Sequence, residues 1–418
     1  MTSLKALFSL ALTAIIATPA AADFRPKARD FSTPANPPIV QAQASGGFEA
    51  WKADFRRRAI AAGISPKVFD IAFQGVRPNE QVHRLAAKQP EFTKPIWEYL
   101  DSAVSSDRIN NGRQSYRNNR QLVESIEKTY GVEASVVVAV WGMETNYGTY
   151  RGNIGTIESL ATLAYTGSRK SFGEEQLMAA LKILQNGDVH PSQMKGSWAG
   201  AMGHTQFIPT SYLSYAQDFN RDGRRDVWST DPTDALASTA AYLKRFGWRH
   251  GQPWGVEVRL PQGFNYANVD QDLKRPVSRW TELGVRGLDG RPVPNHGEAA
   301  LLAPAGARGP IFMIFNNFNV IKRYNNATSY AMGVGHLAAR INGAPDFSAG
   351  WPRGDRALSR TEKLELQRHL NARGFSVGSP DGKIGPLTIG AIRNYQRSQG
   401  LTADGYASAT LLQRIRSQ

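Results

Sequence analysis

A single glutamate, Glu144, ends a long apolar stretch of the chain. Residues 132–148 read VEASVVVAVWGMETNYG, with no charged side chain between Glu133 and Glu144. A helix that is apolar on every face is a buried helix, and Gly148 supplies a stop signal just beyond it. Burial disfavours the charged form of a carboxylate, which is the shift that a general acid near neutral pH needs. The alternative is a carboxylate that caps a neighbouring element or pairs with an arginine, and this stretch alone does not decide between the two.

A second stretch, residues 196–212, reads GSWAGAMGHTQFIPTSY and has a nearly bare backbone. Three glycines, two alanines and a serine stand among its first eight residues, so a bulky ligand could approach the main-chain amides closely. Gln206 offers a donor and an acceptor that suit sugar hydroxyls and amides, and Phe207 and Trp198 offer flat apolar faces for sugar rings. Composition alone favours the alternative, a tight turn packed between helices.

A third stretch, residues 218–229, reads DFNRDGRRDVWS and has the spacing of a calcium-binding EF-hand loop. Its positions 1, 3, 5 and 7 are Asp218, Asn220, Asp222 and the carbonyl of Arg224, and Gly223 stands at the turn position. Position 12 departs from the rule, because it is Ser229 rather than a bidentate glutamate; Asp231 or Asp234 could supply that carboxylate. We expect a structural Ca²⁺ ion in loop 218–234, the alternative being a plain Asx-rich turn.

No other reactive constellation occurs in the chain. It has no cysteine, its seven histidines form no zinc pattern, and it carries no nucleophile-elbow, phosphate-loop or dinucleotide motif. A carboxylate is therefore the remaining catalytic candidate, with no cofactor for catalysis. Glycoside hydrolysis normally needs two carboxylates, but Glu158, Glu174 and Glu175 lie on polar stretches that we expect to be exposed. A single acid that performs both proton transfers points to a nucleophile supplied by the substrate.

Length and composition predict an exported globular protein of two or three domains. The chain has 418 residues, of which 41% are hydrophobic and 20% charged. Residues 1–22 match a cleaved signal peptide, with Lys5 before an apolar run that is too short to span a bilayer. Residues 23–47, rich in Pro, Ala and Gln, predict a flexible linker. With no integral membrane segment and no cysteine for a lipid anchor, we expect a periplasmic location.

The formal net charge of +15 would suit a polyanionic partner. The basic residues are scattered, however, and no Lys/Arg run with interleaved aromatic residues occurs, so we expect no nucleic-acid binding. In an exported protein an acidic cell-wall polymer or an anionic membrane surface is the better partner. A solvated basic surface explains the charge more simply than either.

The remaining patterns predict a mainly helical body. Helical spacing is found in residues 48–63, 96–104, 112–130, 177–184, 234–246 and 330–341, and Ser65-Pro66 opens one further helix. β-Branched and aromatic residues in 256–264 and 311–318 indicate a small β element. A linker, residues 343–357, precedes a module at 358–418, where apolar spacing predicts three short helices punctuated by two Asp-Gly turns. A module this small favours binding over catalysis; a structural helical cap is the alternative.

Three motifs in chain order carry a family resemblance. They are Trp141–Gly148, Ser197–Gly203 with Gln206-Phe207, and Arg323–Asn325 with Tyr330–Met332. Together they resemble the membrane-bound lytic transglycosylase B type (glycoside hydrolase family 103), a lysozyme-like family of peptidoglycan-cleaving enzymes, over residues 48–342. Asp381–Pro386, Ala391-Ile392 and Tyr395-Gln396 are similar to a small peptidoglycan-binding domain. The resemblance implies a mainly α, lysozyme-like (α+β) catalytic body with a small β element, followed by a small three-helix peptidoglycan-binding domain.

The resemblance also implies roles for single residues. Glu144 would protonate the glycosidic oxygen between N-acetylmuramic acid and N-acetylglucosamine, and then act as base toward the muramoyl C6 hydroxyl to give a 1,6-anhydro product. Ser197 matches a serine that holds the catalytic glutamate or the N-acetyl group of the substrate. The other matched positions that contact peptidoglycan are Gln206, Phe207, Tyr324, Asn325, Tyr330, the basic pair Arg169 and Lys170, and, by spacing more than by motif, Tyr99. Asp234 as last metal ligand is an inference, and cell-wall synthases are expected partners.

Two other readings remain open. A hydrolytic muramidase would let water attack, and a second inward carboxylate opposite Glu144 would favour it. A non-catalytic peptidoglycan-binding scaffold would have kept the fold without the reaction, and the intact set of Glu144, Ser197 and Gln206 argues against it.

Overall fold

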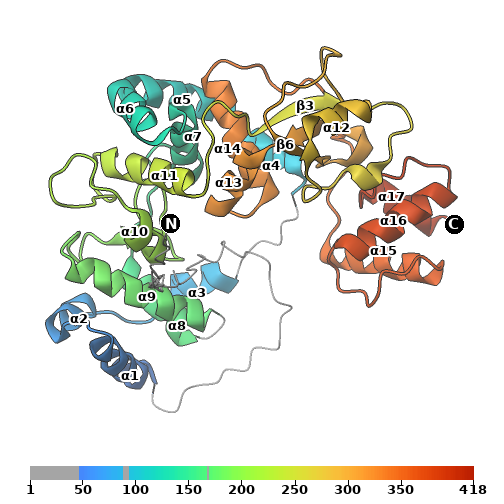
Figure 1. The fold of residues 1–418 in the computed structure, drawn as a ribbon. Helices are drawn as coiled ribbons and strands as arrows, with labels where there is room; N and C mark the ends of the chain where they lie inside the picture. The colour runs from blue at the N-terminus through green and yellow to red at the C-terminus, as the bar shows by residue number, and fades with distance from the viewer. Residues whose placement is uncertain (1–46, 88–93, 167–168) are drawn as a thin grey trace, which may run out of the picture.

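The computed structural model describes residues 47–87, 94–166 and 169–418, and Figure 1 shows their arrangement. The predicted signal peptide, and all but the last residue of the predicted linker at 23–47, lie outside the described residues. Within the described ranges, no helix is both long enough and apolar enough to cross a membrane. The architecture is a mainly helical body, a small antiparallel sheet and a C-terminal domain of three helices.

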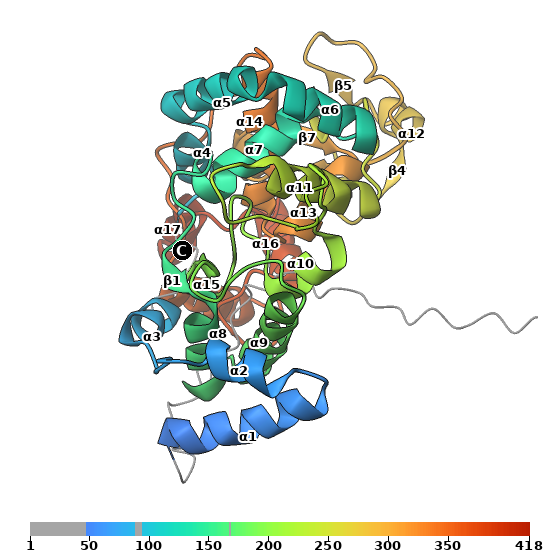
Figure 2. The ribbon, with the colours of Figure 1, turned by 90° about the vertical axis from the view of Figure 1, so that its left-hand side faces the viewer.

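One lobe of the body contains helices from two separate parts of the chain. They are α1 (Gly47–Ala61), α2 (Pro66–Ala72), α3 (Glu80–Ala87), α8 (Thr156–Thr166), α9 (Lys170–Gln185) and α10 (Pro209–Tyr215). Helices α8 and α9 pack against each other, and α2 and α10 pack on α9 (Figure 2). Stacked rings of Phe69 and Phe73, with Phe55 beside them, fill the contact between α1 and α2. The predicted helices at 48–63 and after Ser65 are confirmed.

The second lobe surrounds the apolar helix of the sequence analysis. It comprises α4 (Ile96–Ala103), α5 (Ser106–Asn118), α6 (Arg120–Tyr130), α7 (Ala134–Thr145), α11 (Thr233–Arg245), α13 (Asn316–Tyr324) and α14 (Thr328–Ile341). Helix α7 contacts α5, α6, α11 and α14 (Figure 1), so every side of it is covered. The helical pattern predicted over 112–130 is confirmed, but it forms parts of two helices, because the chain turns at Asn119 (φ −114°) between α5 and α6.

The small β element is a five-stranded antiparallel sheet in the order β4-β6-β7-β3-β5. Its strands are β3 (Gly255–Arg259), β4 (Arg275–Pro276), β5 (Arg286–Gly287), β6 (Glu298–Leu302) and β7 (Ile311–Ile314). Helix α12 (Val277–Glu282) covers it with the buried Trp280, whose indole N–H donates to the carbonyl of Ala299 at 2.8 Å. The strand expected over 311–318 ends at Ile314, because α13 begins at Asn316. Strands β1 (Ile154–Gly155) and β2 (Lys195–Gly196) pair separately within the body.

The C-terminal domain consists of α15 (Arg360–Ala372), α16 (Pro386–Ser398) and α17 (Ala409–Arg416), which confirms the three expected helices. Leu366, Ile392, Leu412 and Ile415 lie in its core. It stands beside the β element (Figure 1), where the Asp404 carboxylate accepts the backbone N–H of Ala307 at 2.8 Å.

The predicted linker at 343–357 packs closely on the body. The Phe347 ring stacks on His336 at 3.8 Å, and the backbone N–H groups of the next two residues donate to Glu257. Further along, the Arg353 guanidinium forms a two-pronged ion pair with Asp101 on α4. These contacts hold residues 343–357 against the body, so the connection to the C-terminal domain is fixed.

Candidate active site

Helix α7 is buried almost throughout, as its apolar sequence predicts. Residues 134–142 and Thr145 are all buried, and Glu144 is half-buried in the last turn. The helix ends because Asn146, Tyr147 and Gly148 adopt positive φ angles of 49°, 59° and 85°. Non-glycine residues seldom adopt this left-handed conformation, and such backbone clusters at functional sites. The end of α7 thus presents one carboxylate from an otherwise apolar helix.

Two tyrosines from other helices lie beside Glu144. The hydroxyl of Tyr330, near the start of α14, donates to Glu144 Oε1 at 2.7 Å. Burial and the negative charge of Glu144 raise the pKa of Tyr99 on α4 to about 12, so that its hydroxyl keeps its proton. Gly333 on α14 lets the helices approach, because a Cβ there would lie 3.0 Å from Met143 and 3.4 Å from Tyr99. Helices α4, α7 and α14 therefore build one cluster around the carboxylate.

The glycines of the segment 196–212 serve internal packing. A Cβ on Gly196 would collide with the carbonyl of Ala201, one on Gly203 with the carbonyl of Val227, and one on Gly200 with the Leu160 side chain. At these three positions glycine is required by packing within the protein, and the approach of a ligand to the main-chain amides stays a prediction. The segment is folded tightly on itself and on its neighbours, which was the alternative that composition favoured.

Gln206 and Ser197 hold defined positions within that segment. Gln206 is buried with φ 55°, and its amide donates to the carbonyls of Arg151 at 3.1 Å and Gly203 at 2.9 Å. The hydroxyl of Ser197, which is half-buried, accepts the backbone N–H of Ala201 at 3.1 Å. Both side chains therefore stabilise the folded segment as well as being candidates to contact a ligand.

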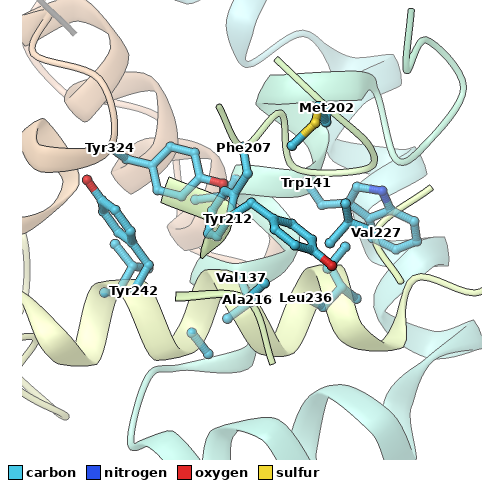
Figure 3. Packing of buried hydrophobic residues seen from close by; sticks show 14 of the residues in the cluster. Val137, Trp141, Met202, Phe207, Tyr212, Ala216, Val227, Leu236, Tyr242 and Tyr324 are labelled. Carbon is cyan, nitrogen blue, oxygen red and sulfur yellow. The ribbon is translucent and has the colours of Figure 1, made fainter. Parts of the chain in front are cut away.

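Phe207 and Tyr324 belong to the hydrophobic core. Phe207 is 2% exposed and packs against Tyr324 and Tyr242, with ring centroids 5.8 Å apart in both pairs (Figure 3). Tyr324 is also buried, and its hydroxyl donates to the carbonyl of Thr205 at 2.6 Å. The expectation that Phe207 offers an open face to a sugar is wrong, because its ring is buried in the core. Tyr324, which the resemblance placed among the sugar-contacting residues, supports the same Gly-rich segment from the core. Asn325 is half-buried, and its side-chain oxygen accepts the N–H of Ala327 at the start of α14.

The basic pair lies at the start of α9. Arg169 stands over the Phe172 ring, 4.3 Å from its centroid, and Lys170 is exposed as the first residue of the helix. Both belong to the lobe that packs under the Gly-rich segment through α10. Their place beside a bound stem peptide stays a prediction.

The other carboxylates that were weighed are engaged or exposed. Glu158 accepts the Asn79 amide at 3.0 Å, and Glu174 forms an ion pair with Arg58. Glu175 is exposed on α9. The expected exposure is therefore confirmed for Glu175 and wrong for Glu158 and Glu174, which are half-buried because their carboxylates bind Asn79 and Arg58.

The Asp-rich loop is closed by its own hydrogen bonds. The Asp218 carboxylate accepts the N–H groups of Asp222 at 3.1 Å and Gly223 at 3.0 Å, and Asp222 accepts that of Arg224 at 2.9 Å. Asp234 is 2% exposed, and its two oxygens accept three backbone N–H groups, those of Phe219, Asn220 and Asp226. Burial raises the pKa of Asp234, and these three bonds oppose the rise. Its observed role is that of a backbone clamp across the loop.

The donor set of this loop fits a hard cation. Its candidate ligands are carboxylate, amide and carbonyl oxygens, which suit Ca²⁺. Asn220, Asp222, Asp226, Ser229 and Asp231 line a small pocket there together with Thr233 and Asp234. In the part of the chain that the structure describes, no three His, Cys, Asp or Glu side chains are grouped to hold a metal. The ion remains a prediction.

His204 is a residue near the end of α7 that no sequence pattern indicated. This histidine stands inside the Gly-rich segment, is 4% exposed, and contacts both the end of α7 and the end of the Asp-rich loop. The only available signal was a lone histidine in an otherwise apolar and small-residue stretch, which more often marks a core residue.

Comparison with known proteins agrees with this geometry. Residues 47–339 match the family model "Transglycosylase SLT domain", and residues 359–415 match "Putative peptidoglycan binding domain". The chain is 31% identical over 271 residues to Membrane-bound lytic murein transglycosylase B of Escherichia coli K12, a match that spans 63% of this chain and 72% of that protein.

Solved structures give the same result. SltB3 from Pseudomonas aeruginosa, in complex with NAG-anhNAM-pentapeptide, is 49% identical with a TM-score of 0.84, and the match covers 88% of this chain and 99% of that one. The Escherichia coli lytic transglycosylase SLT35 in complex with calcium is 29% identical with a TM-score of 0.60, over 70% of this chain and 92% of that one. With its lysozyme-like helical body and its C-terminal peptidoglycan-binding domain, the chain belongs to the lytic transglycosylase family, whose members act on peptidoglycan.

Proposed function

We propose that the chain cleaves the MurNAc-β-1,4-GlcNAc bond of peptidoglycan without water, through Glu144, and leaves a 1,6-anhydroMurNAc end. The observation that carries this proposal is a hydrogen bond, in which the Tyr330 hydroxyl donates to Glu144 Oε1 at 2.7 Å. Glu144 itself lies in the last turn of the otherwise apolar helix α7. A donor held against one carboxylate oxygen fixes the direction in which the group presents its proton. Cell-wall remodelling or recycling would be the use of such a reaction.

The reaction needs one residue to transfer protons twice. Protonated Glu144 gives its proton to the glycosidic oxygen, the bond from that oxygen to the muramoyl C1 breaks, and the GlcNAc portion leaves with a new hydroxyl. The carboxylate then takes the proton of the muramoyl C6 hydroxyl while the C6 oxygen bonds to C1. Glu144 ends protonated, so the cycle consumes neither water nor a cofactor.

The other predicted site residues fall into four groups. Tyr99 and Tyr330 lie at the carboxylate, and Ser197, Gln206 and Asn325 would bind the sugar hydroxyls and N-acetyl groups. Arg169 and Lys170 would attract the carboxylates of the stem peptide. Phe207 and Tyr324 act indirectly, by supporting the segment that carries Gln206.

The test is mass spectrometry of purified sacculi digested with the wild-type protein, with Glu144→Gln, and with Glu175→Gln as the matched control on an exposed site. We expect anhydromuramoyl ends from the wild type and the control and none from Glu144→Gln. Reducing ends in their place would mean that water attacks and the protein is a muramidase. Sacculi bound but uncut by all three proteins would leave a peptidoglycan-binding scaffold.

We also propose that the protein is periplasmic, released from a signal peptide at 1–22, and that its terminal domain keeps it on the glycan strands by raising the local concentration of the enzyme. Partnership with cell-wall synthases is a further expectation. Fractionation of cells that express the full chain, with N-terminal sequencing of the mature form, tests the location. An intact Met1 in the cytoplasmic fraction would contradict it.

A structural Ca²⁺ in loop 218–234 is the last part of the proposal. Asp218, Asn220, Asp222, the Arg224 carbonyl and Asp234 would hold it, and Asp234 also binds the backbone N–H groups that close the loop. Ca²⁺, but not Mg²⁺, should raise the melting temperature of the wild type, because an ion that binds only the folded state stabilises it. Asp218→Asn should lose this response and Asp107→Asn, on the exposed start of α5, should keep it. A wild type that melts identically with Ca²⁺ and with chelator would refute the site.

A further inference from the structure

His204 contacts the end of the catalytic helix with both its ring and its backbone. Its Nδ1 accepts the indole N–H of Trp141 at 3.1 Å, and its carbonyl accepts the hydroxyl of Thr145 at 2.6 Å. The same threonine hydroxyl accepts the N–H of Gly148 at 3.0 Å. Trp141 and Thr145 stand three residues before and one residue after Glu144, so these bonds bracket the carboxylate.

The other side of the ring reaches the end of the Asp-rich loop. Because Nδ1 accepts a hydrogen bond, the neutral ring carries its proton on Nε2, which donates to the carbonyl of Ser229 at 2.8 Å. The backbone N–H of His204 donates to the carbonyl of Val227 at 3.1 Å. Arg151 reinforces the contact by donating to the carbonyls of Trp228 and Ser229. Burial lowers the pKa of His204, which agrees with a neutral ring.

The ring also fits too closely to be a general filler. A Cβ on Gly148 would lie 2.6 Å from His204 Nδ1, so only glycine leaves room for the imidazole against the chain that leaves α7. The ring meets Trp141 edge to face, with centroids 5.6 Å apart. Three separate segments, the end of α7, the Gly-rich segment and residues 227–229, therefore converge on one buried side chain.

We propose that His204 is a positioning residue for the reaction, which locks the last turn of α7 against residues 227–229 and so fixes where Glu144 presents its proton. This inference rests on the proposed role of Glu144. In this role His204 acts through Trp141, Thr145 and the backbone between them. Small displacements of a catalytic group are costly, about 100-fold in rate for about 1 Å.

The test compares substitutions that remove one link or both. His204→Phe keeps a ring but loses both bonds, His204→Asn keeps an acceptor at the Nδ1 position, and His204→Gln keeps a donor at the Nε2 position. His190→Phe is the control, because that histidine is exposed and bonds only within its own turn. We expect His204→Phe to lower kcat on a soluble glycan by about 10- to 100-fold with KM within about twofold. The Asn and Gln variants should fall between, and the control should match the wild type.

Two further measurements separate positioning from loss of stability. Trp141→Phe should lower kcat in the wild type but add nothing to His204→Phe, because the bond is already gone. Hydrogen–deuterium exchange of a peptide covering 141–150 should speed up in His204→Phe while exchange in α15 stays unchanged. Hydrogen–deuterium exchange needs no enzymatic activity. If the protein yields no anhydro ends, the proposed function is refuted, but the exchange still tests whether His204 holds the last turn of α7 in place. An unchanged kcat, additive single effects or unchanged exchange would overturn the inference.

Discussion

Glu144 is held by contacts between residues far apart in the sequence, whereas the two Asp-Gly turns of the C-terminal domain are held by contacts between near neighbours. Tyr330 reaches Glu144 from 186 residues away, and the bond from Thr145 to His204 spans 59 residues. In the terminal domain, Gln367 binds Asp381 only 14 residues on, and Gln396 binds Asp404 only 8 residues on. The candidate active site therefore exists only when the whole body is folded, whereas the terminal domain carries its own local organisation.

The two turns also differ from each other in use. Both are held by a buried glutamine whose oxygen accepts the N–H of the turn glycine, Gly382 or Gly405, at 2.8 Å. Asp404 additionally accepts the N–H of Ala307 in the body, while Asp381 is exposed. The same kind of turn therefore docks on the body at Asp404 and is exposed to solvent at Asp381.

The largest effect on kcat should come from breaking the contact with the greatest sequence separation, between Glu144 and Tyr330. Tyr330→Phe removes the hydroxyl that orients Glu144 and keeps the ring, so kcat on a soluble glycan should fall by about 100-fold. The melting temperature should change little, because a partly solvated carboxylate can be rehydrated. Tyr150→Phe is the control, since that side chain is 72% exposed. Wild-type kcat in Tyr330→Phe would show that the carboxylate is oriented by other groups.

The same contrast explains which features the sequence could reveal. The burial of α7 follows from its unbroken apolar pattern, and the three helices of the terminal domain follow from local spacing and Asp-Gly turns. The pairing of Glu144 with Tyr330 leaves no local trace, because residues so far apart meet only through tertiary packing. Tyr330 was found by its resemblance to a family motif, and His204 was not found.

The features that the sequence did not predict correctly also have physical explanations. Phe207 lies in an irregular segment that has no helical or strand period to say which way a ring points, so an aromatic beside Gln206 resembled a sugar platform. Within the helical pattern of 112–130, neither glycine nor proline stands at the turn, and only the turn-favouring pair Asn118-Asn119 marks it. The β-branched and aromatic run from Ile311 to Phe318 hides the change from strand to helix at Phe315.

A smaller effect should come from the local contacts. Gln367 is 1% exposed and makes five hydrogen bonds, to Asp381 (two), Gly382, Lys383 and Thr388. Gln367→Leu should destabilise the terminal domain by about 2 kcal/mol, because the turn amides lose their acceptor. Hydrogen exchange should then rise in α15 and α16 and remain unchanged in α7.

Kinetics and a control complete that comparison. kcat on a soluble glycan should match the wild type in Gln367→Leu, while binding to sacculi weakens. Gln413→Leu, on an exposed face of α17, should change neither property. Faster exchange in α7 of the Gln367→Leu variant would show that the body and the C-terminal domain fold as one unit, and that the domain is not held by local contacts alone.

The smallest effect concerns the stability of α15, the first helix of the C-terminal domain, at low pH. Ser359 and Glu362 form a reciprocal capping box at α15, and Arg356 pairs with the same carboxylate. The Arg356 hydrogen bond, followed by that from the Ser359 N–H, lowers the pKa of Glu362 from 4.5 to about 2. A carboxyl whose pKa is lowered by folding adds stability above its unfolded pKa, and that stability is lost as the pH falls from about 4.5 through about 2. Glu362→Gln should therefore cost about 1 kcal/mol at pH 7, a typical value for a lost cap, and almost nothing at pH 2. Exchange of α15 amides at both pH values measures this, and an equal effect of the substitution at both would refute the role of the charge.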